Sequence, residues 1–132
     1  MKLKIAVLPG DGIGPEVTNE SIKVLNCIVR KFNHEVEMNE GLVGAIAIDH
    51  NNNPYPDETH KLCLESDAIL FGAIGDPKYD NDPKAKIRPE QGLLEMRKKL
   101  GLYANLRPTI VFDSLLDISP IKEERITGTD IL

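Results

Sequence analysis

The fold of this chain is decided by residues 3–25, which read LKIAVLPGDGIGPEVTNESIKVL. The segment Leu3 to Leu8 is aliphatic and shows no sustained alternation, as expected of a strand that is covered on both faces. A glycine-rich turn from Pro9 to Gly14 ends this strand, and Pro15 suits the first position of a helix. Apolar residues then recur at helical spacing as far as Phe32. The stretch therefore predicts a strand, a glycine-rich loop and a helix.

Strands and helices continue to alternate further along the chain. A strand is expected around Glu35 to Met38, and a fully apolar strand from Asp67 to Ile74. Between them, Asp57 caps or opens a short helix. Residues 41–48 are small and apolar and fit either a helix or a strand, whereas residues 49–56 predict a loop. This alternation indicates a parallel sheet, so the predicted fold class is α/β.

A long polar segment follows the second apolar strand. Residues 75–88 read GDPKYDNDPKAKIR, and their Asp, Gly and Pro content predicts a long loop. The next helix begins at Pro89 and ends before Gly101, with lysines in its last turn, where cations suit the helix dipole. Residues 103–112 contain a proline and predict an edge strand or an extended link. Residues 118–125 predict irregular structure.

The last residues, 126–132, predict a turn that leads into a new apolar strand. A domain that stopped inside a strand would leave backbone groups unpaired. We therefore expect the chain to be a fragment of a longer protein.

The composition excludes several classes of function. The chain has 132 residues, of which 41% are hydrophobic and 28% charged, as in soluble globular domains. A net charge of −5 and an aromatic share of 5% argue against nucleic-acid binding, which relies on clustered cations and stacking rings. No apolar run near the start is long enough for a signal peptide, so a cytoplasmic location without a membrane partner is expected. Cys27 and Cys63 lack metal-ligand spacing and are expected to be reduced packing residues.

The loop GDGIGPE, residues 10–16, invites a dinucleotide-binding interpretation, because glycines let a phosphate approach a helix N-terminus. The match is imperfect, since Pro15 directly follows the third glycine and no ribose-binding acid is clearly placed beyond Glu35 or Glu37. The alternative is a tight turn that needs small residues for steric reasons. The motif by itself favours this steric interpretation.

The helix after Pro89 carries a more informative face. Four residues at i, i+3, i+4 and i+7 line one side of it: Glu90, Leu93, Leu94 and Arg97. Arg107 adds a second guanidinium, and two arginines can hold carboxylates bidentately, which lysines do less well. The alternative is an amphipathic helix with both leucines in the core and Arg107 in a surface ion pair. Spacing alone favours that alternative.

Three segments follow one another in a distinctive order. They read LPGDGIGPEV (residues 8–17), GAIGDPKYD (72–80) and RPEQGLLEMRKKLGLYANLRP (88–108). Together they resemble the successive motifs of the isocitrate and isopropylmalate dehydrogenase family. The resemblance implies that family's α/β fold, which is not a standard Rossmann domain and would be incomplete in this chain. Residues 1–102 would form the first part of the large NAD-side domain, and residues 103–132 the start of the smaller dimerisation and substrate domain.

The resemblance also implies a division of roles on the helix after Pro89. Arg97 and Arg107 would hold the carboxylates of the substrate. Leu93 and Leu94 would contact its isopropyl group, and Glu90 would lie between the substrate and the nicotinamide. Isocitrate dehydrogenases usually place Ser and Asn on the equivalent helix, so the two leucines favour an apolar substituent.

The resemblance places the cofactor beside the polar loop. The loop from Pro77 to Glu90 would border NAD, and Ile13 would lie near the adenosine end. The cofactor contacts implied within the loop are Pro77, Lys78, Tyr79, Asp80 and Glu90. The isopropylmalate branch more often reads GGPKW where residues 75–79 read GDPKY.

For the full-length protein, the resemblance implies NAD-dependent oxidative decarboxylation of 3-isopropylmalate to 2-oxoisocaproate in leucine biosynthesis. The family's catalytic Tyr and Lys, and its aspartate ligands for Mg²⁺ or Mn²⁺, would lie downstream of Leu132. No catalytic residue or metal ligand is therefore expected here, and the chain alone is expected to be inactive and marginally stable, whereas the full-length protein would be a homodimer. The alternatives are a homoisocitrate or tartrate dehydrogenase of the same family, or a truncated fragment without catalysis.

Overall fold

The structure is a computed structural model that describes residues 1–80 and 86–132 of the chain. It divides the chain into two compact units, Met1–Leu102 and Tyr103–Leu132. The functional roles that the resemblance gives to these two parts stay predictions.

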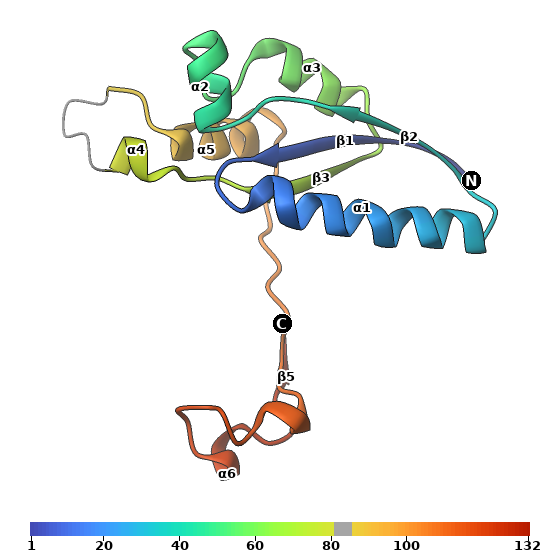
Figure 1. Ribbon diagram of the computed structural model, residues 1–132, viewed down its shortest axis with the longest axis vertical. Helices are drawn as coiled ribbons and strands as arrows, with labels where there is room; N and C mark the ends of the chain where they lie inside the picture. The colour runs from blue at the N-terminus through green and yellow to red at the C-terminus, as the bar shows by residue number, and fades with distance from the viewer. Residues whose placement is uncertain (81–85) are drawn as a thin grey trace. The chain divides into compact units, whose positions relative to one another are not determined.

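The first unit contains a three-stranded parallel sheet with the order β2-β1-β3 (Figure 1). Its strands are β1 (Lys2–Gly10), β2 (Glu35–Glu40) and β3 (Ala68–Ala73). The three strands predicted from the sequence and their parallel arrangement are thus confirmed. Because all three strands run in the same direction, their carboxyl ends meet at one edge of the sheet.

The central strand is buried on both faces, as its aliphatic sequence predicts. Side chains alternate between the faces of a strand, so Ala6 and Leu8 share one face while Ile5 and Val7 share the other. None of these four is more than 8% exposed. A sheet with apolar side chains on both faces needs a helical layer on each side.

Helices supply these layers (Figure 1). The long helix α1 (Gly14–Lys31) packs along β1 and β3 on one face of the sheet. The helices α3 (Asp57–Leu64) and α5 (Pro89–Lys99) lie on the opposite face, with α2 (Ala45–Asn51) beside them. A single turn, α4 (Pro77–Asp80), follows the third strand. The helix from Pro89 therefore begins and ends where the sequence predicts.

The main core lies between the sheet and the helices α3 and α5. Its buried members come from the central strand, from α3 and α5, and from the segments on either side of α2: Ala6, Leu8, Val43, Tyr55, Cys63 and Met96. Leu93 of α5 packs against this cluster from its edge. Cys63 is a packing residue, as expected, whereas the same expectation for Cys27 is wrong, because Cys27 is exposed on α1.

Two helical segments differ from the sequence predictions. The predicted loop over residues 49–56 is wrong at its start, since α2 continues to Asn51. The predicted loop over residues 75–88 is wrong at Pro77–Asp80, which form the turn α4. The residues of that loop at 81–85 lie outside the described part of the chain. Both helices depend on contacts with distant residues, which local patterns do not show.

The second unit is small and has its own two-stranded antiparallel sheet, β4 (Thr109–Ile110) with β5 (Asp130–Ile131). An extended segment after Pro108 and a strand near residue 130 are thus confirmed. Between the strands lie a 3-10 helix at Asp113–Leu115 and the turn α6 (Glu123–Ile126). The prediction of irregular structure is therefore wrong from Glu123 onward. Among all described helices, none combines the length and apolarity needed to cross a membrane.

Candidate functional site

The candidate site lies at the carboxyl edge of the parallel sheet. In open α/β sheets ligands bind outside the carboxyl ends of the strands. Three connecting segments meet there: residues 11–13 after β1, residues 41–44 after β2 and residues 74–76 after β3. The Asp11 N–H donates to the Ala73 carbonyl oxygen at 2.8 Å, which joins the first and third of these segments.

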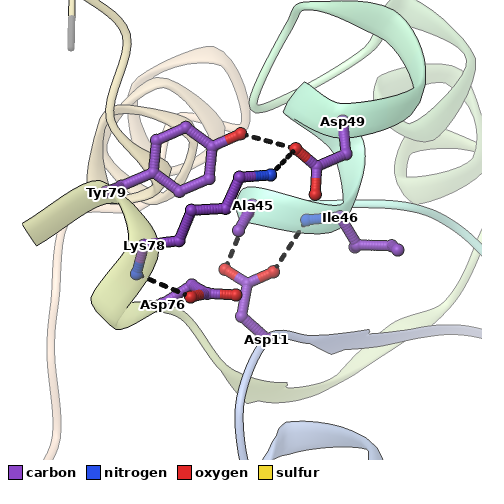
Figure 2. A network of polar contacts seen from close by, with 7 residues as sticks. All are labelled: Asp11, Ala45, Ile46, Asp49, Asp76, Lys78 and Tyr79. Carbon is purple, nitrogen blue, oxygen red and sulfur yellow. Dashed lines mark hydrogen bonds and ion pairs between the residues drawn. The ribbon is translucent and has the colours of Figure 1, made fainter. Parts of the chain in front are cut away.

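Asp11 organises this edge through its carboxylate. The residue is buried, with only 5% of its surface exposed. Its Oδ2 accepts hydrogen bonds from the Ala45 N–H at 2.7 Å and the Gly75 N–H at 3.2 Å, and its Oδ1 accepts one from the Ile46 N–H at 3.0 Å. The first amides of α2 are thus capped by a residue from another element (Figure 2). Sequence reasoning gave Asp11 no role, although an acid between two glycines after a buried strand is a usable signal.

The glycines of the first loop serve close packing of the backbone. Gly10 has a φ of +73°, and a Cβ there would lie 2.0 Å from the Ala73 oxygen. A Cβ on Gly14 would lie 2.0 Å from the Pro9 oxygen. The steric interpretation of the loop is therefore confirmed. The nearby N-terminus of α2 already receives its negative charge from Asp11.

Ile13 projects from the same loop at the N-cap position of α1 and is 68% exposed. An exposed branched side chain at the edge of a sheet offers an apolar surface to a flat ring. Its contact with the adenosine end of NAD stays a prediction, and its exposure fits that role.

Three side chains connect α4 to α2. The Lys78 Nζ lies 2.6 Å from the Asp49 Oδ1, and the Tyr79 hydroxyl donates to the same oxygen at 2.8 Å (Figure 2). Hydrogen bonds from Lys78 and Tyr79 lower the pKa of Asp49, and the bond to Asp49 raises the pKa of Lys78. Both partners therefore carry full charge at neutral pH. Sequence reasoning missed Asp49 because it lies in the segment predicted as a loop.

The remaining predicted cofactor residues lie on or next to the same turn. Pro77 and Asp80 are exposed at its two ends. The Tyr79 carbonyl accepts a hydrogen bond from the Arg88 guanidinium at 3.4 Å, and Arg88 is the N-cap residue of α5. The turn that follows β3 is thus held from both α2 and the start of α5.

The helix α5 brings Glu90 to this edge and separates its two leucines. A Cβ built on Gly75 would lie 3.6 Å from the Glu90 Oε1, so the carboxylate approaches the segment after β3. Leu93 packs against the core, whereas Leu94 is 64% exposed. Arg97, one turn further, is also exposed. The helix face thus offers an acid, one free branched side chain and a guanidinium, and their roles toward a substrate stay predictions.

Arg107 belongs to the second unit, just before β4, and is exposed there. Each arginine is therefore exposed, as a carboxylate clamp requires. The joint action of Arg97 and Arg107 on one substrate stays a prediction.

The residues at this edge include an apolar surface and polar groups, both of which a dinucleotide can use. Ile13 offers an apolar surface, and the turn α4 offers polar groups at the position where open α/β sheets bind ligands. Within residues 1–80 and 86–132, no three His, Cys, Asp or Glu side chains are grouped so that they could hold a metal ion.

Known proteins resemble this chain over nearly its whole length. The family model for isocitrate/isopropylmalate dehydrogenases matches residues 4–132. Among curated relatives, a 3-isopropylmalate dehydrogenase of Bacteroides fragilis is 52% identical over 132 residues, covering 100% of this chain and 37% of the relative. One of Aquifex aeolicus is 56% identical over 131 residues, covering 99% of this chain and 36% of the relative. The chain thus spans little more than a third of the length of these relatives.

Solved structures give the same result. A β-decarboxylating dehydrogenase of Thermococcus kodakarensis matches with a TM-score of 0.65 and 34% identity, over 83% of this chain and 30% of that one. An isocitrate dehydrogenase of Methylococcus capsulatus matches with a TM-score of 0.64 and 27% identity, over 83% and 29%. Sequence, fold and motif order agree, and the chain belongs to the isocitrate/isopropylmalate dehydrogenase family.

Proposed function

We propose that the protein containing this chain is a 3-isopropylmalate dehydrogenase that uses NAD. The observation that carries the proposal is the exposed Leu94, which lies on the same face of α5 as Glu90 and Arg97. A substrate with an apolar branch between carboxylates needs this combination of an apolar wall and a cation. The curated relatives named above carry the same activity in their names.

The chain's own residues would bind and orient the substrate. Arg97 and Arg107 would each hold a carboxylate through a planar fork of donors. Leu94 would cover the isopropyl group and exclude water from it, because its side chain is not used by the core. Leu93 would contribute mainly by packing α5 against the core, which fixes the position of its neighbour.

The cofactor would lie along the carboxyl edge of the sheet. Ile13 would support its adenosine end, and the turn Pro77–Asp80 with Glu90 would border the nicotinamide. When bound, NAD would accept the hydride, and Mg²⁺ or Mn²⁺ would stabilise the enolate that forms on decarboxylation. The metal ligands would lie in the remainder of the full-length protein, as the family resemblance implies.

The wider setting follows from the same proposal. Residues 1–102 would belong to the NAD-side domain and residues 103–132 to the smaller domain, through which the full-length protein would form a homodimer. The protein would act in leucine biosynthesis in the cytoplasm, without nucleic acid or membrane partners.

A substrate screen tests the proposal. The purified full-length protein is assayed for NAD reduction with 3-isopropylmalate, isocitrate, homoisocitrate and tartrate, each with Mg²⁺. The proposal expects the highest kcat/KM with 3-isopropylmalate. A higher kcat/KM with homoisocitrate or tartrate would mean that the protein belongs to another branch of the family. No turnover with any of the four substrates would favour the non-catalytic alternative.

The arginine clamp has its own test. Arg97→Lys keeps the positive charge but loses the planar fork, so the KM for 3-isopropylmalate should rise or kcat should fall while the KM for NAD stays nearly unchanged. Kinetics equal to those of the parent would mean that Arg97 makes only surface contacts.

A further inference from the structure

Asp49 accepts two hydrogen bonds from the turn that the proposed function places beside the cofactor. We propose that Asp49 is a positioning residue, which holds the turn Pro77–Asp80 in the conformation that binds NAD. The inference rests on the proposed function, because it concerns the cofactor side of that site. Nothing in the family motifs quoted above includes Asp49.

The geometry concentrates the tether on one atom. The Lys78 ammonium and the Tyr79 hydroxyl both bond to the Asp49 Oδ1, at 2.6 Å and 2.8 Å. The Lys78 Nζ also lies 5.3 Å from the centre of the Tyr79 ring, within the range of a cation–π contact. Two adjacent residues of α4 are thus fixed to a single carboxylate on α2 (Figure 2).

The turn α4 needs such a tether because it is short. It has four residues, and helices of this length are not stable by themselves. Two hydrogen bonds link it to the residue before it: the Tyr79 N–H donates to the Asp76 carbonyl oxygen at 2.9 Å, and the Lys78 N–H donates to the Asp76 side chain at 2.9 Å. Asp49 and Arg88, which lie outside the turn, bond to it and so help to set its position.

The helix α2 transmits the support. Its first amides bond to the buried carboxylate of Asp11, which fixes the helix relative to the sheet. Asp49 lies toward the other end of the same helix and reaches α4 from there. The alternative is a surface ion pair without function, since the side chains of Lys78 and Asp49 are 60% and 45% exposed and such pairs contribute little to stability. The experiment therefore measures the conformation of the turn Pro77–Asp80 rather than the free energy of unfolding.

The experiment compares Asp49→Ala, Asp49→Asn and Asp49→Glu in the full-length protein, with Glu35→Gln as the control. Glu35 also pairs with a lysine, Lys2, at 3.0 Å, and both are exposed at the amino ends of their strands. Two quantities are measured: the rate at which trypsin cleaves between Lys78 and Tyr79, and the separate KM values for NAD and for 3-isopropylmalate.

Asp49→Ala should speed cleavage and raise the KM for NAD by about 3- to 10-fold, because the tether is exposed and each bond is modest. The KM for 3-isopropylmalate should change less than 2-fold on the same scale. Asp49→Asn should show a smaller effect, since an amide oxygen still accepts from the hydroxyl, and Asp49→Glu should restore part of the NAD affinity. Glu35→Gln should match the parent.

Three other outcomes would contradict the proposal. Faster cleavage with an unchanged KM for NAD would overturn the positioning role. An equal rise in both KM values would also overturn it, because general loosening would explain that result. A parent protein that reduces no NAD would overturn the proposed function and the positioning role with it, while the cleavage rates would still show whether Asp49 holds the turn.

Discussion

Replacing Asp11 with alanine tests whether one buried carboxylate organises the carboxyl edge of the sheet. The substitution removes the acceptor of three backbone amides, those of Ala45, Ile46 and Gly75. The hydrogen bond from the Ala45 N–H is buried, and a buried donor without a partner costs about 1 to 3 kcal/mol. The other two bonds are part-buried, and water can replace them at a cost of about 0.5 to 1 kcal/mol in all.

The expected loss of stability around α2 is therefore about 1.5 to 4 kcal/mol, or roughly 10- to 800-fold in the local opening equilibrium. Hydrogen exchange measured on the full-length protein reports this opening residue by residue. The amide of Ala45 should exchange at least about tenfold faster. The Asp67 amide, which bonds to the Lys4 oxygen at 2.8 Å near the amino ends of the strands, should be unchanged.

Asp67→Ala is the matched control variant. Its carboxylate accepts one exposed bond, from the Lys4 N–H at 2.8 Å, so its removal should cost only about 0.5 to 1.5 kcal/mol. If the Ala45 amide exchanges at the parent rate in Asp11→Ala, the Asp11 carboxylate does not organise this edge. A loss of stability no greater than that of Asp67→Ala would lead to the same conclusion.

Three further predictions concern other parts of the chain. Arg107→Lys should raise the KM for 3-isopropylmalate or lower kcat while sparing the KM for NAD, and parent-like kinetics would favour the surface ion pair. Exposed Cys27 should react at once with a thiol reagent, whereas burial raises the pKa of Cys63 and should delay its labelling until the protein unfolds; equal labelling rates in peptide mass spectrometry would contradict this. Hydrogen bonds from the α4 side chains lower the pKa of Asp49. The stability that these bonds contribute is therefore present above the ordinary carboxyl pKa, and it is lost only as the pH falls through the lowered pKa. An NMR titration midpoint of Asp49 at or above 3.8 would count against that tether.

Local sequence patterns were sufficient for the elements that carry a strong periodicity. The aliphatic run before Gly10 fixes β1 because both faces of that strand are buried. Pro89 and Gly101 mark the start and end of α5 because each suits a special backbone position at a helix terminus. The turn α4 could not be predicted in this way, since its conformation depends on Asp49, which lies 29 and 30 residues before its two donors.

In the candidate site, too, local spacing predicts some residues, whereas others depend on contacts between distant parts of the chain. Glu90 and Arg97 could be placed on one helix face because their spacing is local. Spacing alone could not distinguish Leu93 from Leu94, because the contact of Leu93 with the core depends on how the helix packs. Asp11 escaped notice as a functional residue, since its partner Ala45 lies 34 residues away in a segment that fits either a helix or a strand.

The most direct test of the proposed substrate compares Leu94→Ala with Leu93→Ala in the full-length protein. The kcat/KM is measured for 3-isopropylmalate and for unsubstituted malate. Leu94→Ala should lower the value for 3-isopropylmalate by about 10- to 200-fold more than for malate, because only the isopropyl group loses contacts. Leu93→Ala should instead lower stability by about 2 kcal/mol and affect both substrates alike. If Leu94→Ala lowers both values by the same factor, Leu94 does not form the substrate pocket and the proposal of 3-isopropylmalate is contradicted.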